Sequence, residues 1–138
     1  MRARAAKKSR DPEKTRAHIL AVACNAIYQK GFQGVSIDQI VEQTDVTKGA
    51  FFHYFPTKSE VGYAIVDEYL RDAVLDRWIR PLAAYRNPLQ GILRLFKRTV
   101  ETWPDENLGR GCPLNNFAQE MSSVDPVFSQ KIQAVKCQ

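Results

Sequence analysis

The sequence has few cysteines and no long apolar run, and these two absences exclude several classes of protein. Cysteine occurs three times among 138 residues, at wide spacing and never as C-x-x-C, which argues against a disulfide framework and against a structural zinc site. The uninterrupted apolar runs are far shorter than the ~20 residues that cross a bilayer, and residues 1–16 have no apolar stretch of the kind found in signal peptides. We therefore expect a cytoplasmic protein without a membrane segment.

The patterns that accompany common catalytic sites are also missing. Histidine occurs only at His18 and His53, and neither belongs to a Ser/His/Asp spacing, a carboxylate pair on one helix face or a phosphate-binding glycine loop. We therefore expect no catalytic residues, no cofactor and no metal ion, and we do not expect an enzyme. Cys24 lies among apolar residues of a predicted helix, where a buried thiol is expected.

The positive charge of the chain is concentrated at its beginning. The composition is that of a globular protein, with 44% hydrophobic and 25% charged residues and a net charge of +5. Residues 1–10 hold five basic residues and no acid, so the remainder of the chain is electrically balanced. Residues 1–11 are therefore predicted to form a basic, flexible arm, which is either a solvated terminus or a segment that binds phosphates or a DNA minor groove.

Residues 36–60 have the pattern of two short helices joined by a polar turn. Ser36 and Gln39 have the spacing of a capping box, in which each side chain satisfies a backbone amide of the other residue. The apolar residues that follow have i, i+3 and i+4 spacing, which predicts one buried stripe on a helix of about two turns. These residues are Ile37, Ile40 and Val41.

The second of these helices is predicted to cover residues 47–54. Thr47 can cap its first turn, and Phe51 and Phe55 lie four residues apart, so that both face the core. The residues that face elsewhere are Lys48, Gly49, Phe52 and His53. Periodicity alone also permits two core helices of an ordinary α domain, whereas a helix-turn-helix would present the second helix to the major groove of DNA.

A long helix is predicted to follow Pro56, which ends the preceding helix. Thr57 and Glu60 repeat the capping-box spacing. Lys58 falls in the first turn, where a cation is unfavourable unless an anion such as a phosphate lies nearby. The helix is expected to run to about residue 80, where Pro81 would end it. The residues expected to face inward are Val61, Ile65, Tyr69 and Val74.

The other predicted elements are helices too. One begins after Asp11 as its cap and ends at Gly31. Others cover residues 88–103, residues 114–122 and the segment that starts at Asp125, and no strand pattern appears. The expected fold class is therefore all-α.

The chain resembles the TetR family of bacterial transcriptional regulators over roughly residues 12–72. The resemblance is carried by residues 15–20 and by the following segments: Gly31-Phe32, Val35-Ser36-Ile37, Ile40-Val41, Val46-Thr47-Lys48-Gly49, His53-Tyr54-Phe55 and Lys58. The resemblance implies a three-helix helix-turn-helix domain in which residues 47–54 form the recognition helix. It also implies base contacts by Lys48, Gly49, Ala50, Phe52 and His53, and phosphate contacts by Ser36, Thr47, Tyr54 and Lys58.

For residues 73–138 the resemblance implies part of a second α-helical domain that binds a small-molecule effector and forms a homodimer. Residues 111–118 are similar to a segment of many members. The aromatic and sulfur side chains that could line an effector pocket are Phe96, Trp103, Phe117 and Met121, although plain core packing would account for each of them.

Members of the family are longer, and the two helices that usually form the dimer interface are not recognisable here. This difference predicts a chain that dimerises poorly and whose last apolar residues lie exposed: Val127, Phe128, Ile132 and Val135. The expected function is a sequence-specific repressor that a small molecule releases from its double-stranded DNA operator. The alternative is a truncated or non-DNA-binding interaction protein.

Overall fold

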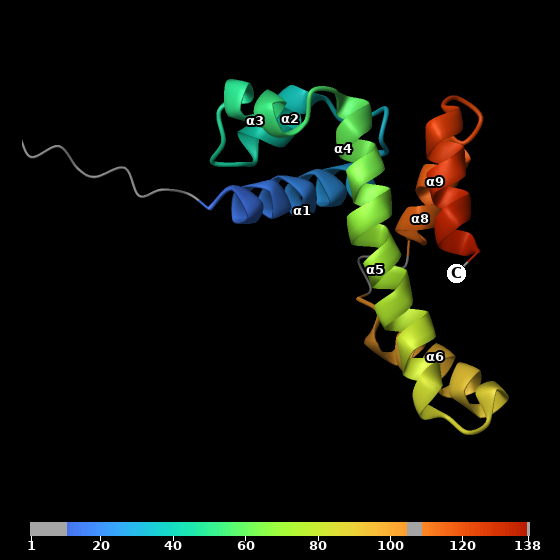
Figure 1. Cartoon of the computed structure of the whole chain (residues 1–138). Helices are drawn as coiled ribbons and strands as arrows, with labels where there is room; N and C mark the ends of the chain where they lie inside the picture. Colours follow the sequence, from blue (N-terminus) through green and yellow to red (C-terminus); the bar gives the residue numbers. More distant parts are fainter. Residues whose placement is uncertain (1–10, 105–108, 138) are drawn as a thin grey trace, which may run out of the picture.

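The computed structural model describes residues 11–104 and 109–137, and every regular element within those residues is a helix (Figure 1). The all-α prediction is confirmed. The α-helices are α1 (Pro12–Lys30), α2 (Ile37–Glu42), α3 (Lys48–Tyr54), α4 (Lys58–Ala64), α5 (Arg71–Val74), α6 (Pro88–Thr102), α8 (Pro113–Met121) and α9 (Pro126–Lys136). Helical segments of other types continue α4 and α5: η1 (Ile65–Leu70), η2 (Leu75–Ile79) and η3 (Arg80–Ala84).

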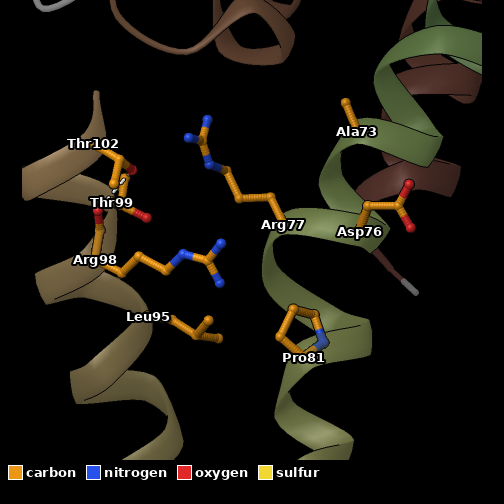
Figure 2. A pocket seen from close by; sticks show the side chains of 8 residues that line it. All are labelled: Ala73, Asp76, Arg77, Pro81, Leu95, Arg98, Thr99 and Thr102. Carbon is orange, nitrogen blue, oxygen red and sulfur yellow. Dashed lines mark hydrogen bonds between the residues drawn. The ribbon is translucent and has the colours of Figure 1, made fainter. Parts of the chain in front are cut away.

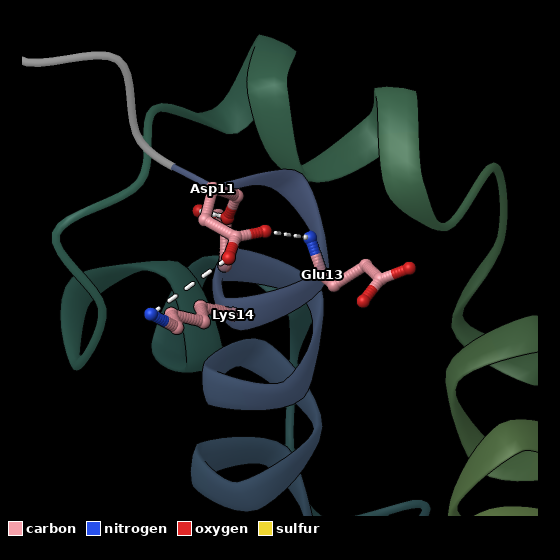
Figure 3. Close-up of polar contacts among 4 residues, drawn as sticks. Asp11, Glu13 and Lys14 are labelled. Carbon is pink, nitrogen blue, oxygen red and sulfur yellow. Dashed lines mark hydrogen bonds and ion pairs between the residues drawn. The ribbon is translucent and has the colours of Figure 1, made fainter.

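Asp11 belongs to the beginning of α1 and not to the predicted arm. Its Oδ1 accepts a hydrogen bond of 3.1 Å from the backbone N–H of Glu13, and Lys14 lies 3.8 Å from its other carboxylate oxygen (Figure 3). An N-cap with proline next to it satisfies free amides at the start of a helix. Residues 1–10, which carry the basic charge of the predicted arm, lie outside the described residues.

Residues 58–84 form one continuous helical rod, here called the long helix, which runs away from α1–α3 (Figure 1). Two of its segments, η1 and η2, are π-helical. The wider π turn moves the buried position by one residue, so Leu70 is 5% exposed whereas Tyr69, predicted to face inward, is 47% exposed. Pro81 was predicted to end the long helix, but the rod continues to Ala84. Proline is tolerated here because it lies in the first turn of the 3₁₀ segment η3, where no N–H is needed.

The main core lies where the long helix crosses α1, α8 and α9. It includes Ile19, Ile40, Phe51 and Ile65, all of them fully buried. Burial raises the pKa of the Cys24 thiol to about 11, as expected for a core cysteine.

The prediction that the last apolar residues lie exposed is wrong for three of the four. Phe128, Ile132 and Val135 are buried, whereas Val127 is 39% exposed. The reason is that α9 packs against α4 and η1 of the long helix, not against a later helix (Figure 1). Contacts between segments this far apart in sequence cannot be derived from helical periodicity.

Helix α6 lies at the other end of the rod, next to η3 (Figure 1). Asn87 caps it through hydrogen bonds from the N–H groups of Leu89 and Gln90. Its buried residues are Gly91 and Leu95. Its large apolar side chains with the helical spacing read from the sequence are exposed among the described residues: Leu89, Ile92, Leu93, Phe96 and Val100.

Gly62 is required where α4 meets α9. A Cβ atom at this position would lie 2.4 Å from Phe128 and 2.7 Å from Phe32, distances at which both rings must move. We expect Gly62→Ala to lower the free energy of unfolding by about 1–3 kcal/mol, as overpacking in a dense core does. Urea denaturation followed by circular dichroism measures the change.

The matched control is Gly49→Ala in α3, where an added Cβ meets no atom within 4 Å. Alanine is up to about 1 kcal/mol more favourable than glycine in a helix, so this variant should be unchanged or slightly more stable. Equal stability of both variants would contradict the assigned packing of Gly62.

Candidate nucleic-acid interface

Helices α2 and α3 and the turn between them form a helix-turn-helix. The capping box predicted at the start of α2 is present, because the N–H of Gln39 donates to Ser36 Oγ at 3.2 Å and the N–H of Ser36 donates to Gln39 Oε1 at 3.0 Å. Ile40 is fully buried beneath the motif. The start of α2 is thereby fixed relative to the core.

The turn depends on two threonines. Thr44 Oγ1 donates to the carbonyl of Val41 at 2.9 Å and accepts from the N–H of Val46 at 3.4 Å. Thr47 caps α3 by accepting from the N–H of Ala50 at 3.2 Å, as predicted. The role of Thr44 was not predicted, although a threonine at a helix end can form this type of local bond.

Two phenylalanines anchor α3 and leave its other side free. Phe51 and Phe55 are buried, as predicted. The exposed residues of α3, here called the reading face, are Lys48, Gly49, Phe52 and His53. Phe52 is 39% exposed and meets the ring of Phe51 edge to face, with the centroids 5.9 Å apart. A side chain that is held by its neighbour and remains exposed can contact another surface with little loss of entropy.

Lys48 forms an ion pair that sequence analysis missed. Its Nζ lies 2.6 Å from Asp38 Oδ1 of α2, and both side chains are more than half exposed. An exposed pair of this kind contributes little to stability. Lys48 can therefore exchange Asp38 for another anion at small cost.

Tyr54 and Lys58, predicted to contact phosphates, lie closer to the core than the reading face does. Tyr54 is half-buried and packs against core residues. The ammonium group of Lys58 lies 4.7 Å from the centroid of the Phe32 ring, within range of a cation–π interaction. Burial lowers the pKa of Lys58 below its ordinary value, and the nearby carboxylate of Glu120 opposes that shift. Thr57 caps α4 through the N–H of Glu60 at 3.2 Å.

Glu120 of α8 binds the loop that connects α1 to α2. Its two carboxylate oxygens accept hydrogen bonds from the backbone N–H groups of Phe32 at 2.7 Å and Gln33 at 2.6 Å. Such charge-assisted bonds are about twice as strong as neutral ones. Sequence analysis did not find this contact, because Glu120 and Phe32 are 88 residues apart in the sequence.

The four residues proposed for an effector pocket do not line one cavity. Phe117 and Met121 are buried in the main core, where Phe117 packs on Phe128 with centroids 5.8 Å apart. Phe96 is exposed and contacts Trp78, with centroids 5.3 Å apart. Trp103 is half-buried under the guanidinium group of Arg77. The four side chains are separated because α8 packs on η1 of the long helix whereas α6 packs on η3 at its far end (Figure 1). Their part in effector binding stays a prediction.

A helix-turn-helix with a buried rear face and an exposed second helix defines the class of DNA-binding helical domains. Residues 19–62 match the sequence profile of the bacterial regulatory proteins of the tetR family. The chain is 32% identical over 127 residues to the transcriptional regulator AcuR of Cereibacter sphaeroides, covering 85% of this chain and 54% of AcuR. It is 31% identical over 102 residues to the regulator RutR of Escherichia coli, covering 72% of this chain and 46% of RutR.

Solved structures have the same fold. A TetR transcriptional regulator from Chloroflexus aurantiacus superposes with a TM-score of 0.74 and 27% identity, covering 90% of this chain and 62% of that one. The reduced form of E. coli NemR superposes with a TM-score of 0.75 at 22% identity, covering 88% of this chain and 63% of NemR. The chain belongs to the TetR family, and it spans about half the length of the curated relatives it matches. Within the described residues no helix is long and apolar enough to cross a membrane.

Glu120→Gln tests the contact between α8 and the α1–α2 loop. The amide can accept a hydrogen bond from only one of the two N–H groups, and the charge is removed, so we expect the free energy of unfolding to fall by about 1–3 kcal/mol. The control is Glu101→Gln on α6, whose carboxylate is exposed and 3.9 Å from Lys97. Chemical denaturation should leave the control within about 0.5 kcal/mol of the wild type, and similar decreases in both variants would contradict the contact.

Proposed function

We propose that this chain is a sequence-specific DNA-binding transcriptional regulator, and in particular a repressor that a small molecule releases from its operator. The observation that carries the proposal is the geometry of α3, in which Phe51 and Phe55 hold the helix while the reading face is exposed. The names of the relatives, which are regulators and repressors, support the same function. A protein that acts on the bacterial chromosome would work in the cytoplasm.

We assign base contacts to the reading face and to Ala50, and phosphate contacts to the polar groups around it. A lysine can donate to guanine, and the ring of Phe52 can contact a thymine methyl group. Gly49 adds no side chain at a point where a DNA groove would approach closely. The proposed phosphate contacts come from Ser36, Thr47, Tyr54 and Lys58.

The proposal also assigns a separate function to each segment of the chain. Residues 12–72 would bind DNA, residues 73–138 would contribute to effector binding and dimerisation, and the basic residues of the N-terminal arm would add phosphate contacts. A homodimer would place two recognition helices about one helical turn of DNA apart, ~34–36 Å. The same geometry explains why an operator of this family would be two-fold symmetric.

Selection of binding sites from a random DNA library tests the reading face. We expect His53→Ala and Lys48→Ala to change the preferred sequence, because a base contact contributes about 1–3 kcal/mol of discrimination. His18→Ala is the control, since His18 lies on an exposed part of α1 outside the reading face. Identical preferred sequences for the wild type and all three variants would show that the reading face does not recognise bases.

Lys58→Ala tests the phosphate contacts. We expect weaker binding to specific and random duplexes alike, and a salt slope smaller by about 0.9 for each phosphate that the lysine no longer neutralises. Gel shifts across a series of salt concentrations measure both quantities. Lys97→Ala, on the exposed side of α6, should leave them unchanged.

An unchanged salt slope for Lys58→Ala would assign Lys58 to its contact with Phe32 alone. If the wild-type chain itself binds no duplex in a salt-dependent manner, the interaction-protein alternative would replace the proposed function.

A further inference from the structure

A groove of about 300 Å³ lies between the long helix and α6 (Figure 2). One wall is formed by α5, η2 and the start of η3, and the other wall is formed by α6. The residues that matter for its chemistry are Arg77 and Pro81 on the first wall and Leu95, Arg98 and Thr99 on the second. We call this the arginine groove. A volume of this size suits a small molecule and not a macromolecule.

Two guanidinium groups point into the same space from opposite walls (Figure 2). Within residues 11–104 and 109–137, no carboxylate forms an ion pair with Arg77 or Arg98. Asp76 also borders the groove, but its carboxylate pairs with Arg80 and points away from both guanidinium groups. Two positive charges that share one groove repel each other, and an anion bound there would lower that repulsion.

The neighbours of the two arginines suit an anionic ligand as well. The Arg77 guanidinium lies 4.3 Å from the centroid of the Trp103 ring, which limits its freedom before a ligand arrives. The hydroxyl of Thr102 donates to the carbonyl of Arg98 at 2.7 Å and is therefore engaged. The Thr99 hydroxyl has no partner among the described residues and can donate to a ligand. The buried Leu95 and the half-buried Pro81 supply an apolar floor.

We infer that the arginine groove binds a small organic anion, whose carboxylate or phosphate group lies between Arg77 and Arg98 and whose short apolar part rests on Leu95 and Pro81. Guanidinium groups match both of these head groups through paired N–H donors. A neutral or cationic molecule of the same shape would leave the repulsion between the arginines in place. The inference rests on the proposed function in one respect, because it assigns this anion as the effector.

The position of the groove connects it to the DNA-binding helices. Arg77 lies on the same continuous rod as Lys58, whereas Arg98 lies on α6. An anion that binds both arginines would draw α6 and segment η2 of the rod together. The anion can alter DNA affinity only as far as it prefers one arrangement of these helices over the other.

Isothermal titration calorimetry of the full chain without DNA tests the site. The probes are butyrate, benzoate and inorganic phosphate, and the controls are butyramide and benzamide, which have the shape of the two carboxylates without the charge. We expect at least one anion to bind and neither amide to bind. Binding of phosphate alone would identify a phosphate group, and binding of butyrate or benzoate alone would identify a carboxylate with an apolar part.

The variants are Arg98→Gln and Arg77→Gln, each of which should weaken binding of the anion at least tenfold. Arg98→Gln is the cleaner variant because it leaves the contact between Arg77 and Trp103 in place. The control is Arg94→Gln, one turn earlier on α6, whose guanidinium lies over Tyr85 and does not line the groove, so this change should not affect the affinity. Circular dichroism verifies that each variant is folded.

The inference is overturned if no anion binds the wild type, if the amides bind as tightly as the anions, or if Arg98→Gln and Arg94→Gln bind equally well. A gel shift with and without the bound anion then tests the effector role, where a fall in DNA affinity supports the role and an unchanged affinity overturns it. Failure of the chain to bind DNA without any anion would overturn the proposed function and leave the calorimetric result intact.

Discussion

The structure depends on the close contact of two aromatic rings with the backbone of Gly62. Phe32 follows α1 and Phe128 belongs to α9, and their centroids lie 5.1 Å apart in an edge-to-face arrangement above α4. Only a residue without a Cβ atom lets both rings approach the helix this closely. The contact joins the end of α1, the start of the long helix and α9, so the helices that support α3 and the helices that follow α6 share one core.

Polar contacts around this core determine how its helices are oriented relative to one another. Glu120 holds the α1–α2 loop, Tyr63 donates to Asp125 at 2.6 Å, and Lys131 pairs with Asp67 of the long helix. The hydrogen bond from Tyr63 holds the pKa of Asp125 below its usual range. Apolar packing alone permits small rotations of one helix on another, whereas bonds of this kind select one arrangement. These bonds therefore fix the orientation of α8 and α9 relative to the α1–α2 loop and the long helix.

Sequence reasoning succeeded where the determinants are local. The capping box of Ser36, the cap by Thr47 and the anchors Phe51 and Phe55 depend on residues within four positions of each other. It failed in two places. Helical periodicity does not anticipate the π segments, which placed Leu70 inward instead of Tyr69, and α9 packs on a helix that lies far earlier in the sequence. Phe117 and Phe96 both lie in predicted helices, and only the tertiary contacts separate a core ring from an exposed one. The roles of Ser36, Lys58 and the reading face in DNA binding remain predictions.

The long helix connects a restrained end to a less restrained one. Near Gly62 and Ile65 it is packed by α1 and α9, whereas at Arg77 its described neighbour is α6, whose large apolar side chains are mostly exposed. At roughly 1.5 Å per residue, Lys58 and Arg77 lie about 28 Å apart along the rod. A packed core resists continuous deformation and changes between discrete arrangements. A force applied near Arg77 would therefore bend the weakly packed part first. The displacement would reach Lys58 and α3 only if the residues packed around Gly62 move together with the rod as one rigid unit. The packing that stabilises the fold therefore also determines how strongly the two ends of the rod are coupled.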